Sequence, residues 1–171
     1  MLVAARAYPF LILLITGCAG TPPPASAPSD MLGKPVEMTL PTDSGQLAAI
    51  PAPGAKATVA DFFAPSCAPC AHKLPALYRR QAELETLGAK LVLIGLLAGR
   101  ENTQDAQSAL SAWGVPGAPF LVDAGDASKR EAGVRTLPTT LVLDAHGVVR
   151  WAASAESTAD DVVAAARAAS R

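Results

Sequence analysis

Two cysteines three positions apart, Cys67 and Cys70, lie where one predicted element gives way to the next. Residues 58–63 have the length and composition of a buried strand, and residues 67–87 are expected to form one helix that ends at Gly88. A cysteine in the first turn of a helix lies close to unpaired backbone N–H groups and the positive end of the helix dipole. Both lower the pKa of its thiol. This strand–cysteine–helix order constrains both the fold and the chemistry.

The rest of the chain alternates between short apolar runs and helix-forming segments. We expect a β-hairpin at residues 36–40 and 46–50, further strands at 90–97, 120–122, 139–143 and 148–152, and helices at 102–113, 126–132 and from Ser157 or Thr158 onward. Turn formers separate the last two strands, which predicts an antiparallel pair. The alternation predicts an α/β domain with helices around a central sheet. In a chain of 171 residues we expect one such domain, at residues 31–171.

Residues 1–17 have the features of an export signal, with a positive charge at Arg6 and an apolar stretch at residues 7–15. The stretch is too short to span a bilayer, which takes about 20 apolar residues. Residues 14–18, Leu-Ile-Thr-Gly-Cys, resemble a bacterial lipobox. The resemblance implies that Cys18 carries lipid and becomes the mature N-terminus. The alternative is an ordinary cleaved signal in which Cys18 is incidental.

Residues 18–30 are rich in proline, alanine, serine and threonine and contain too few large apolar residues for a core. Such a segment is a partly extended tether. Several acyl chains hold a protein firmly to a bilayer, whereas one chain alone binds weakly. We therefore expect the protein in the cell envelope, anchored to a membrane through Cys18 and facing the periplasm. Ala19 after Cys18 is compatible with the outer membrane.

Composition narrows the partners and the use of the cysteines. The formal net charge is −1, and the sequence has none of the basic clusters that favour nucleic-acid binding. Three cysteines leave one odd thiol in an exported protein. Lipidation of Cys18 accounts for it. Cys67 and Cys70 are then free to form a disulfide in an oxidising compartment.

Cys67 and Cys70 are predicted to react one after the other, Cys67 first. Because the thiolate is the attacking species in disulfide exchange, Cys67 at the helix start would open a substrate disulfide. Cys70, one turn later, would resolve the mixed disulfide. Ala68 and Pro69, which separate the two cysteines, are expected to tune the redox potential. Pro69 also stiffens the loop, at a position where its missing N–H costs no helical hydrogen bond.

Residues 59–70, Val-Ala-Asp-Phe-Phe-Ala-Pro-Ser-Cys-Ala-Pro-Cys, resemble the active-site stretch of thioredoxins. The resemblance implies that Asp61 is the family's buried acid, which shuttles a proton for the resolving thiol. It also implies that Pro75 kinks the active-site helix. In Leu-Pro-Thr at 137–139, it implies that Pro138 is the cis-proline that packs beside the disulfide and guides the substrate backbone.

The predicted N-terminal hairpin, an inserted strand–helix segment near residues 113–132, and residues 137–147 resemble TlpA/ResA-type disulfide reductases over residues 31–171. The resemblance implies a thioredoxin-like fold with a central mixed sheet, a monomer, and no cofactor besides its own disulfide. The implied partners are disulfides of exported proteins and a thiol protein that donates electrons. Two positions depart from the pattern. Ser66 stands where the family usually has Trp, and Thr139 where the cytochrome c maturation branch has Glu.

Other functions would use the same residues. A disulfide-forming oxidant of the DsbA type has the same fold with a more stabilised thiolate. Cys67 and Cys70 could instead bind Cu(I) for delivery to another protein, or form half of a zinc site with His72 and His146 as the remaining candidates. Residues 65–67 also faintly resemble a peroxidatic cysteine loop. Metal content, peroxide consumption and insulin reduction distinguish these functions.

Overall fold

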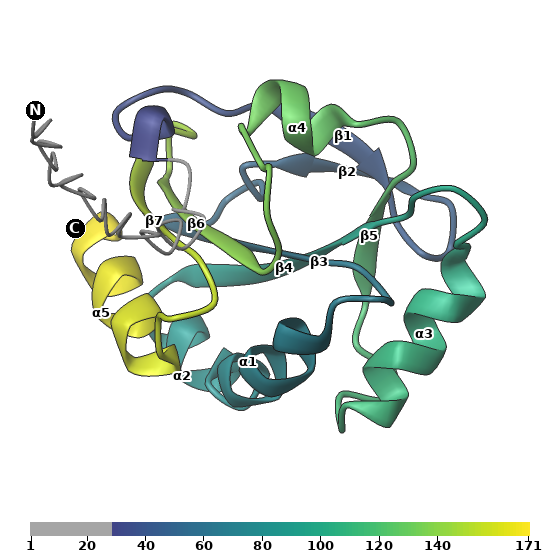
Figure 1. The fold of residues 1–171 in the computed structure, drawn as a ribbon. Helices are drawn as coiled ribbons and strands as arrows, with labels where there is room; N and C mark the ends of the chain where they lie inside the picture. The colour runs from purple at the N-terminus through teal and green to yellow at the C-terminus, as the bar shows by residue number, and fades with distance from the viewer. Residues whose placement is uncertain (1–28) are drawn as a thin grey trace, which may run out of the picture.

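Figure 1 shows the computed structural model, which describes residues 29–171. The strands are β1 (Met38–Pro41), β2 (Leu47–Ile50), β3 (Ala57–Phe63), β4 (Ala89–Leu96), β5 (Phe120–Asp123), β6 (Thr139–Asp144) and β7 (Val149–Ala153). The helices are η1 (Ser29–Met31), α1 (Ala68–Tyr78), α2 (Gln81–Thr86), α3 (Thr103–Ala112), α4 (Ala127–Glu131) and α5 (Ala159–Ala169). The predicted leader at residues 1–17, the lipidated Cys18 and the tether as far as residue 28 lie outside the described residues.

Five strands form one sheet in the order β5-β4-β3-β6-β7. β3 pairs in parallel with β4, and β4 with β5, whereas β6 runs antiparallel to both β3 and β7. β3 lies at the centre, and all seven of its residues are buried. A strand covered on both faces has a nearly continuous apolar sequence. The prediction of an α/β fold with a central mixed sheet is confirmed.

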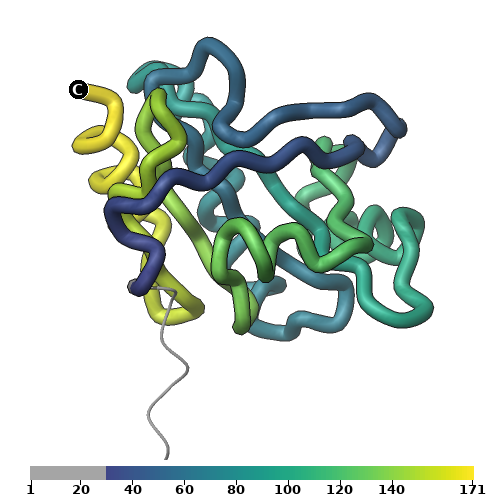
Figure 2. Tube along the Cα trace, turned by 90° about the horizontal axis from the view of Figure 1, so that it is seen from above, coloured from purple at the N-terminus to yellow at the C-terminus, as the bar shows by residue number. Residues whose placement is uncertain are grey.

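The hairpin β1–β2 and helix α4 cover one face of the sheet, as Figure 2 shows from above. Met38 and Ile50 of the hairpin pack in one apolar cluster with Phe62, Ile94 and Leu141 of the central strands. The predicted N-terminal hairpin is therefore present. The strand–helix segment expected near residues 113–132 corresponds to β5 and α4.

Four helices, α1, α2, α3 and α5, cover the opposite face (Figure 1). Leu74 of α1 and Leu110 of α3 belong to one buried cluster. Leu77 of α1, Leu84 of α2 and Val162 of α5 belong to a second. Full burial of such a side chain contributes roughly 1.5–3 kcal/mol, so these contacts hold α1 firmly against the sheet.

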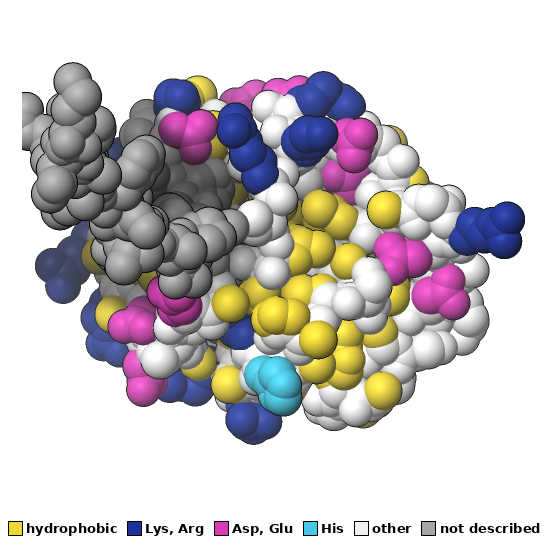
Figure 3. Space-filling view, viewed as in Figure 1, with side chains coloured by type: hydrophobic (Ala, Val, Ile, Leu, Met, Phe, Trp, Pro, Cys, Tyr) yellow, Lys and Arg dark blue, Asp and Glu magenta, His cyan; other side chains and the backbone are white. Residues whose placement is uncertain are grey.

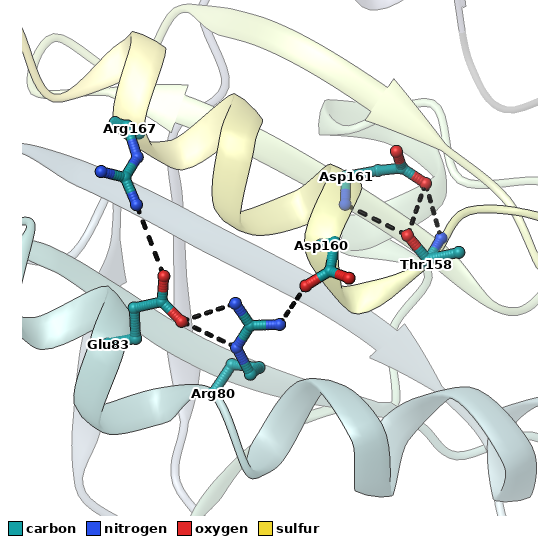
Figure 4. A network of polar contacts seen from close by, with 6 residues as sticks. All are labelled: Arg80, Glu83, Thr158, Asp160, Asp161 and Arg167. Atoms are coloured by element: carbon teal, nitrogen blue, oxygen red, sulfur yellow. Dashed lines mark hydrogen bonds and ion pairs between the residues drawn. The ribbon is translucent and has the colours of Figure 1, made fainter.

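The prediction of a single helix over residues 67–87 is wrong, because the chain forms α1 and α2 with a break between them. The N–H of Arg80 donates to the carbonyl of Leu77 at 2.9 Å, which closes α1 with a tight turn. The Arg80 guanidinium then pairs with Glu83 of α2 at 2.6 Å and with Asp160 of α5 (Figure 4). Contacts with α5 accompany the break, and no residue in this stretch is of a type that signals it.

The other helix ends follow local capping signals. Asn102 begins α3 and accepts the N–H groups of Gln104 and Asp105. Thr158, one of the two residues expected to begin the last helix, caps α5 together with Asp161 (Figure 4). α1 and α5 have 11 residues each, and none of the helices within residues 29–171 has the length and apolar character to cross a bilayer.

Candidate active site

Cys67 and Cys70 form a disulfide at the N-terminal end of α1. Cys67 is the N-cap residue, with extended backbone, and its Sγ accepts the N–H of Cys70 at 3.2 Å. Ala68 and Pro69 are the first two helical residues, a place where proline costs no helical hydrogen bond. The sulfur of Cys67 therefore lies against the first turn of the helix, a setting that stabilises its thiolate after reduction.

The two cysteines differ in access to solvent. Cys67 is 9% exposed, whereas Cys70 is 0% exposed. A substrate disulfide can therefore reach Cys67 and not Cys70. This asymmetry agrees with the predicted order, in which Cys67 attacks and Cys70 resolves.

Cys67 opens onto a groove of about 600 Å³ between the start of α1 and helix α4. Figure 3 shows hydrophobic side chains gathered at the centre of this face, between α4 and α1, with charged side chains of both signs nearby. The apolar lining includes Leu96, Val134 and Leu137, and Glu101 and Lys129 are among its charged residues. Cys67 is thus one of the residues that line a mainly apolar groove.

The segment before β6 completes this surface. The Leu137–Pro138 peptide bond is cis. Pro138 is buried, and Leu137 packs against the apolar cluster that contains Cys67 and Cys70. The tertiary structure thus brings this segment, distant in sequence, to the disulfide.

Asp61 is a fully buried carboxylic acid in the middle of β3. The β3–β6 register sets it opposite Thr140, whose hydroxyl donates to Asp61 Oδ2 at 2.5 Å. Asp61 Oδ1 has no hydrogen-bond partner among residues 29–171. Burial raises the pKa of Asp61 to about 6, against the opposing effects of the Lys73 charge and the Thr140 hydrogen bond.

Asp61 lies on the sheet face that α1 covers. Alternate residues of a strand share a face, and the neighbours of Asp61 on this face are Val59 and Phe63. Phe63 belongs to the same cluster as Cys70, and Val59 to the same cluster as Leu77 of α1. The acid therefore lies under the helix that carries Cys70.

Lys73 is a part of this site that the sequence patterns did not identify. It is only 9% exposed, and its Nζ donates to Thr140 Oγ1 at 2.6 Å and to the carbonyl of Ser154 at 3.0 Å. Burial lowers the pKa of Lys73, and the charge of Asp61 acts in the opposite direction. One signal was present: Lys73 falls on the same helical stripe as Cys70 and Leu77, where an apolar residue is expected.

The two histidines lie outside this arrangement. His72 is exposed on α1, and His146 lies in the β6–β7 turn, where its N–H donates to Asp144. In the part of the chain that the structure describes, no three His, Cys, Asp or Glu side chains are grouped so that they could hold a metal ion.

A model of the Redoxin family matches residues 28–168. No curated protein matches the chain significantly. A putative thiol:disulfide interchange protein DsbE from Chlorobium tepidum is 23% identical, with a TM-score of 0.66, over 79% of this chain and 97% of that chain. StoA from Bacillus subtilis is 23% identical, with a TM-score of 0.62, over 78% and 98%. A hypothetical protein from Sinorhizobium meliloti is 20% identical, with a TM-score of 0.71, over 86% and 88%.

At these identities the solved structures establish the fold, which is the thioredoxin-like fold expected from the sequence. The family match covers most of the chain and includes both cysteines of the disulfide. The chain therefore belongs to the Redoxin family and is a thiol:disulfide oxidoreductase.

Proposed function

We propose that this protein reduces disulfide bonds of exported proteins while anchored to a membrane of the cell envelope. The observation that carries the proposal is the asymmetry of the disulfide, in which Cys67 opens onto a groove and Cys70 is buried. A reductase needs one accessible attacking thiolate and one resolving thiol beside it. The Ala68–Pro69 pair resembles the reducing members of the superfamily.

The reaction begins with the dithiol form. The Cys67 thiolate attacks one sulfur of the substrate disulfide, the substrate S–S bond breaks, and the other substrate sulfur leaves as a thiolate. Cys70 then loses its proton and attacks the Cys67 sulfur. A Cys67–Cys70 disulfide forms and the second substrate sulfur leaves. Two electrons pass from the protein to the substrate, and a donor thiol protein restores the dithiol.

Asp61 is the proposed acceptor of the Cys70 proton. A buried thiol is hard to ionise, because burial disfavours its thiolate. Asp61 lies on the sheet face under α1 with one oxygen unpartnered among the described residues, and its pKa of about 6 lets the carboxylate accept a proton near neutral pH. The proton passes to solvent or to the departing substrate thiolate after resolution.

The groove beside Cys67 is the proposed binding surface for the substrate segment. Leu96 and Leu137 offer apolar contact, and Glu101 and Lys129 supply both signs of charge. Such a surface suits apolar residues next to a substrate cysteine and does not favour a strongly charged segment of either sign. Pro138, buried at the start of β6, is the proposed guide for the substrate backbone.

The direction of electron flow is tested by the equilibrium reduction potential of the Cys67–Cys70 pair, measured in thiol–disulfide buffers. A reductase is expected near thioredoxin's value of about −270 mV, whereas an oxidant lies near about −120 mV. A value at the oxidising end would replace this proposal with disulfide formation. Without a two-electron transition, neither function stands.

The order of attack is tested with single cysteine variants in an insulin reduction assay. Cys67→Ser should reduce insulin no faster than a protein-free control, because the attacking thiolate is gone. Cys70→Ser should accumulate a mixed disulfide with the substrate. Cys18→Ser is the matched control and should keep full activity. Trapping by Cys67→Ser instead would reverse the assigned roles.

The lipid anchor is tested in cells supplied with radiolabelled palmitate. The proposal is supported by the lipobox resemblance at residues 14–18. The protein should incorporate label and sediment with membranes, and Cys18→Ser should do neither. A soluble, unlabelled protein with normal reductase activity would remove the anchor from the proposal and leave the chemistry intact.

A further inference from the structure

We infer that Lys73, acting through the hydroxyl of Thr140, is a positioning residue for proton transfer at Asp61. Its charge keeps the Asp61 carboxylate ionised at neutral pH. The hydrogen-bond chain holds one carboxylate oxygen and leaves the other to exchange a proton with Cys70. The inference rests on the proposed function, in which Asp61 accepts the proton of Cys70.

Three side chains from three different elements make this chain. Lys73 Nζ of α1 donates to Thr140 Oγ1 of β6 at 2.6 Å, and Thr140 Oγ1 donates to Asp61 Oδ2 of β3 at 2.5 Å. A lysine ammonium has donors and no acceptor. Thr140 must therefore accept from Lys73, and its own proton points toward Asp61. The direction of both hydrogen bonds is fixed by the charge on Lys73.

The fixed direction distinguishes the two oxygens of Asp61. Oδ2 is held by Thr140, whereas Oδ1 is buried without a hydrogen-bond partner in residues 29–171. Oδ1 is the oxygen that can receive a proton without breaking an existing hydrogen bond.

The charge of Lys73 acts on Asp61 with little competition. The other buried residues that β4 and α5 place on this face are apolar: Leu93, Val162, Val163 and Ala166. On α1, Cys70 is buried with Lys73, whereas His72 is exposed to solvent. Lys73 is the charge that lowers the pKa of Asp61 against the effect of burial. A single buried charge therefore controls how readily the acid ionises.

The contacts of Lys73 also explain why it assists Asp61 without neutralising it in a direct ion pair. Nζ donates to two uncharged oxygens, Thr140 Oγ1 and the Ser154 carbonyl. The ion pairs within residues 29–171 do not include Lys73. One hydroxyl thus separates the two charges. The carboxylate is stabilised enough to ionise and remains basic enough to take the proton of a thiol.

The test uses the full chain, purified in detergent and reduced, with four variants at two positions. Lys73→Met removes the charge and the donor, Lys73→Gln removes the charge and keeps a donor, and Lys73→Arg keeps both. Asp61→Asn removes the base. Lys90→Met, an exposed lysine on β4, is the matched control.

Two quantities are measured for each variant over a range of pH. The first is the titration of the Asp61 carboxyl carbon by NMR, recorded on samples whose Cys67–Cys70 disulfide has been re-formed and assigned from the signal that Asp61→Asn loses. The second is stopped-flow release of nitrothiobenzoate from 5,5′-dithiobis(2-nitrobenzoate). The first equivalent reports attack by Cys67, and the second reports resolution by Cys70. A purely structural role for Lys73 would change neither the titration midpoint nor the ratio of the two phases.

We expect Asp61 to titrate near pH 6 in the unmodified protein. In Lys73→Met and Lys73→Gln the midpoint should rise by about 1 pH unit or more, because the favourable charge is gone. The second phase should slow by about threefold or more near pH 6.5, since fewer Asp61 carboxylates are ionised, and the first phase should keep its rate. Lys73→Arg should restore both values, and Lys90→Met should match the unmodified protein.

Two results would overturn the inference. In the first, Lys73→Met leaves the midpoint and the second phase unchanged while Asp61→Asn slows the second phase. Asp61 would then remain the base, and Lys73 would have no part in the proton transfer. The other is Lys73→Gln with the unmodified midpoint, since the charge would then be irrelevant. If Asp61→Asn releases both equivalents of nitrothiobenzoate at the normal rates, Asp61 is not the acceptor of the Cys70 proton. The proposed role of Asp61 is then wrong, and so is the inference that rests on it.

Discussion

Two buried aspartates of the same sheet differ in the number of hydrogen bonds that their carboxylates accept. Asp123, at the end of β5, is 4% exposed and accepts three backbone N–H groups, from Gly125 at 3.1 Å, Ala127 at 3.1 Å and Ser128 at 2.6 Å. Asp61, in the middle of β3, is 0% exposed and accepts one hydroxyl. One acid is saturated with donors, and the other has an oxygen unpartnered in the described part of the chain.

The difference appears in their ionisation. Burial raises the pKa of Asp123, but hydrogen bonds from Ser128, Gly125 and Ala127 outweigh it, and the pKa falls below its usual value. For Asp61, burial outweighs Lys73 and Thr140, and the pKa rises to about 6. Burial of a carboxylate therefore does not by itself indicate function. Donors that saturate the charge make an acid structural, and a shortage of donors leaves it able to exchange protons.

The largest effect is expected from Asp123→Ala. The substitution leaves three N–H groups at the β5–α4 turn without their acceptor and should lower the free energy of unfolding by roughly 3–4 kcal/mol at pH 7. Because the pKa of Asp123 is lowered, this loss should shrink as the pH falls through that pKa. Chemical denaturation at pH 7 and at a series of pH values below 3.8 measures it, with Asp123→Asn, which keeps one acceptor, as control. A loss that does not depend on pH would remove the contrast with Asp61.

Asp61→Asn should change the free energy of unfolding in the opposite direction from Asp123→Ala. Between pH 3.8 and about 6 the folded protein keeps a proton on Asp61 that the unfolded chain releases, so stability falls as the pH rises through this range. The difference of about two pKa units corresponds to about 3 kcal/mol. Asp61→Asn should therefore raise the free energy of unfolding by roughly 2–3 kcal/mol at pH 8 and change it little at pH 4.

This result is measured by denaturation of the oxidised protein, with its disulfide intact. The same variant should slow resolution by Cys70 near neutral pH, so stability and activity move in opposite directions. A variant that is less stable at pH 8 would mean that Asp61 is a structural acid of the Asp123 kind.

The smallest effect is expected from Thr140→Val, which removes the hydroxyl between Lys73 and Asp61. Loss of this hydrogen bond should raise the pKa of Asp61 further and lower the free energy of unfolding by about 1 kcal/mol at pH 8. Thr140→Ser keeps the hydroxyl and should retain both values. Denaturation and the NMR titration of Asp61 measure the two changes. Unchanged values in Thr140→Val would show that the hydroxyl does not link Lys73 to Asp61.

Most of the fold could be predicted because its signals are local. The apolar run of β3, the turn formers around β6 and β7, and the caps at Asn102 and Thr158 each depend on neighbouring residues. The break between α1 and α2 could not be predicted in this way. It coincides with contacts between Arg80 and Asp160, which are far apart in the sequence and meet only when α5 packs beside α2.

The sequence by itself determined the order of strand, cysteine pair and helix, because spacing along one chain sets which cysteine begins the helix. It also singled out Asp61 and Pro138, through resemblance to a known active site. Only the tertiary structure decided that Thr140 lies opposite Asp61 and that Lys73 is buried with its amino group on Thr140. Strand register and helix docking depend on the packing of distant segments, so a lysine in the sequence shows neither its burial nor the acid whose ionisation it controls.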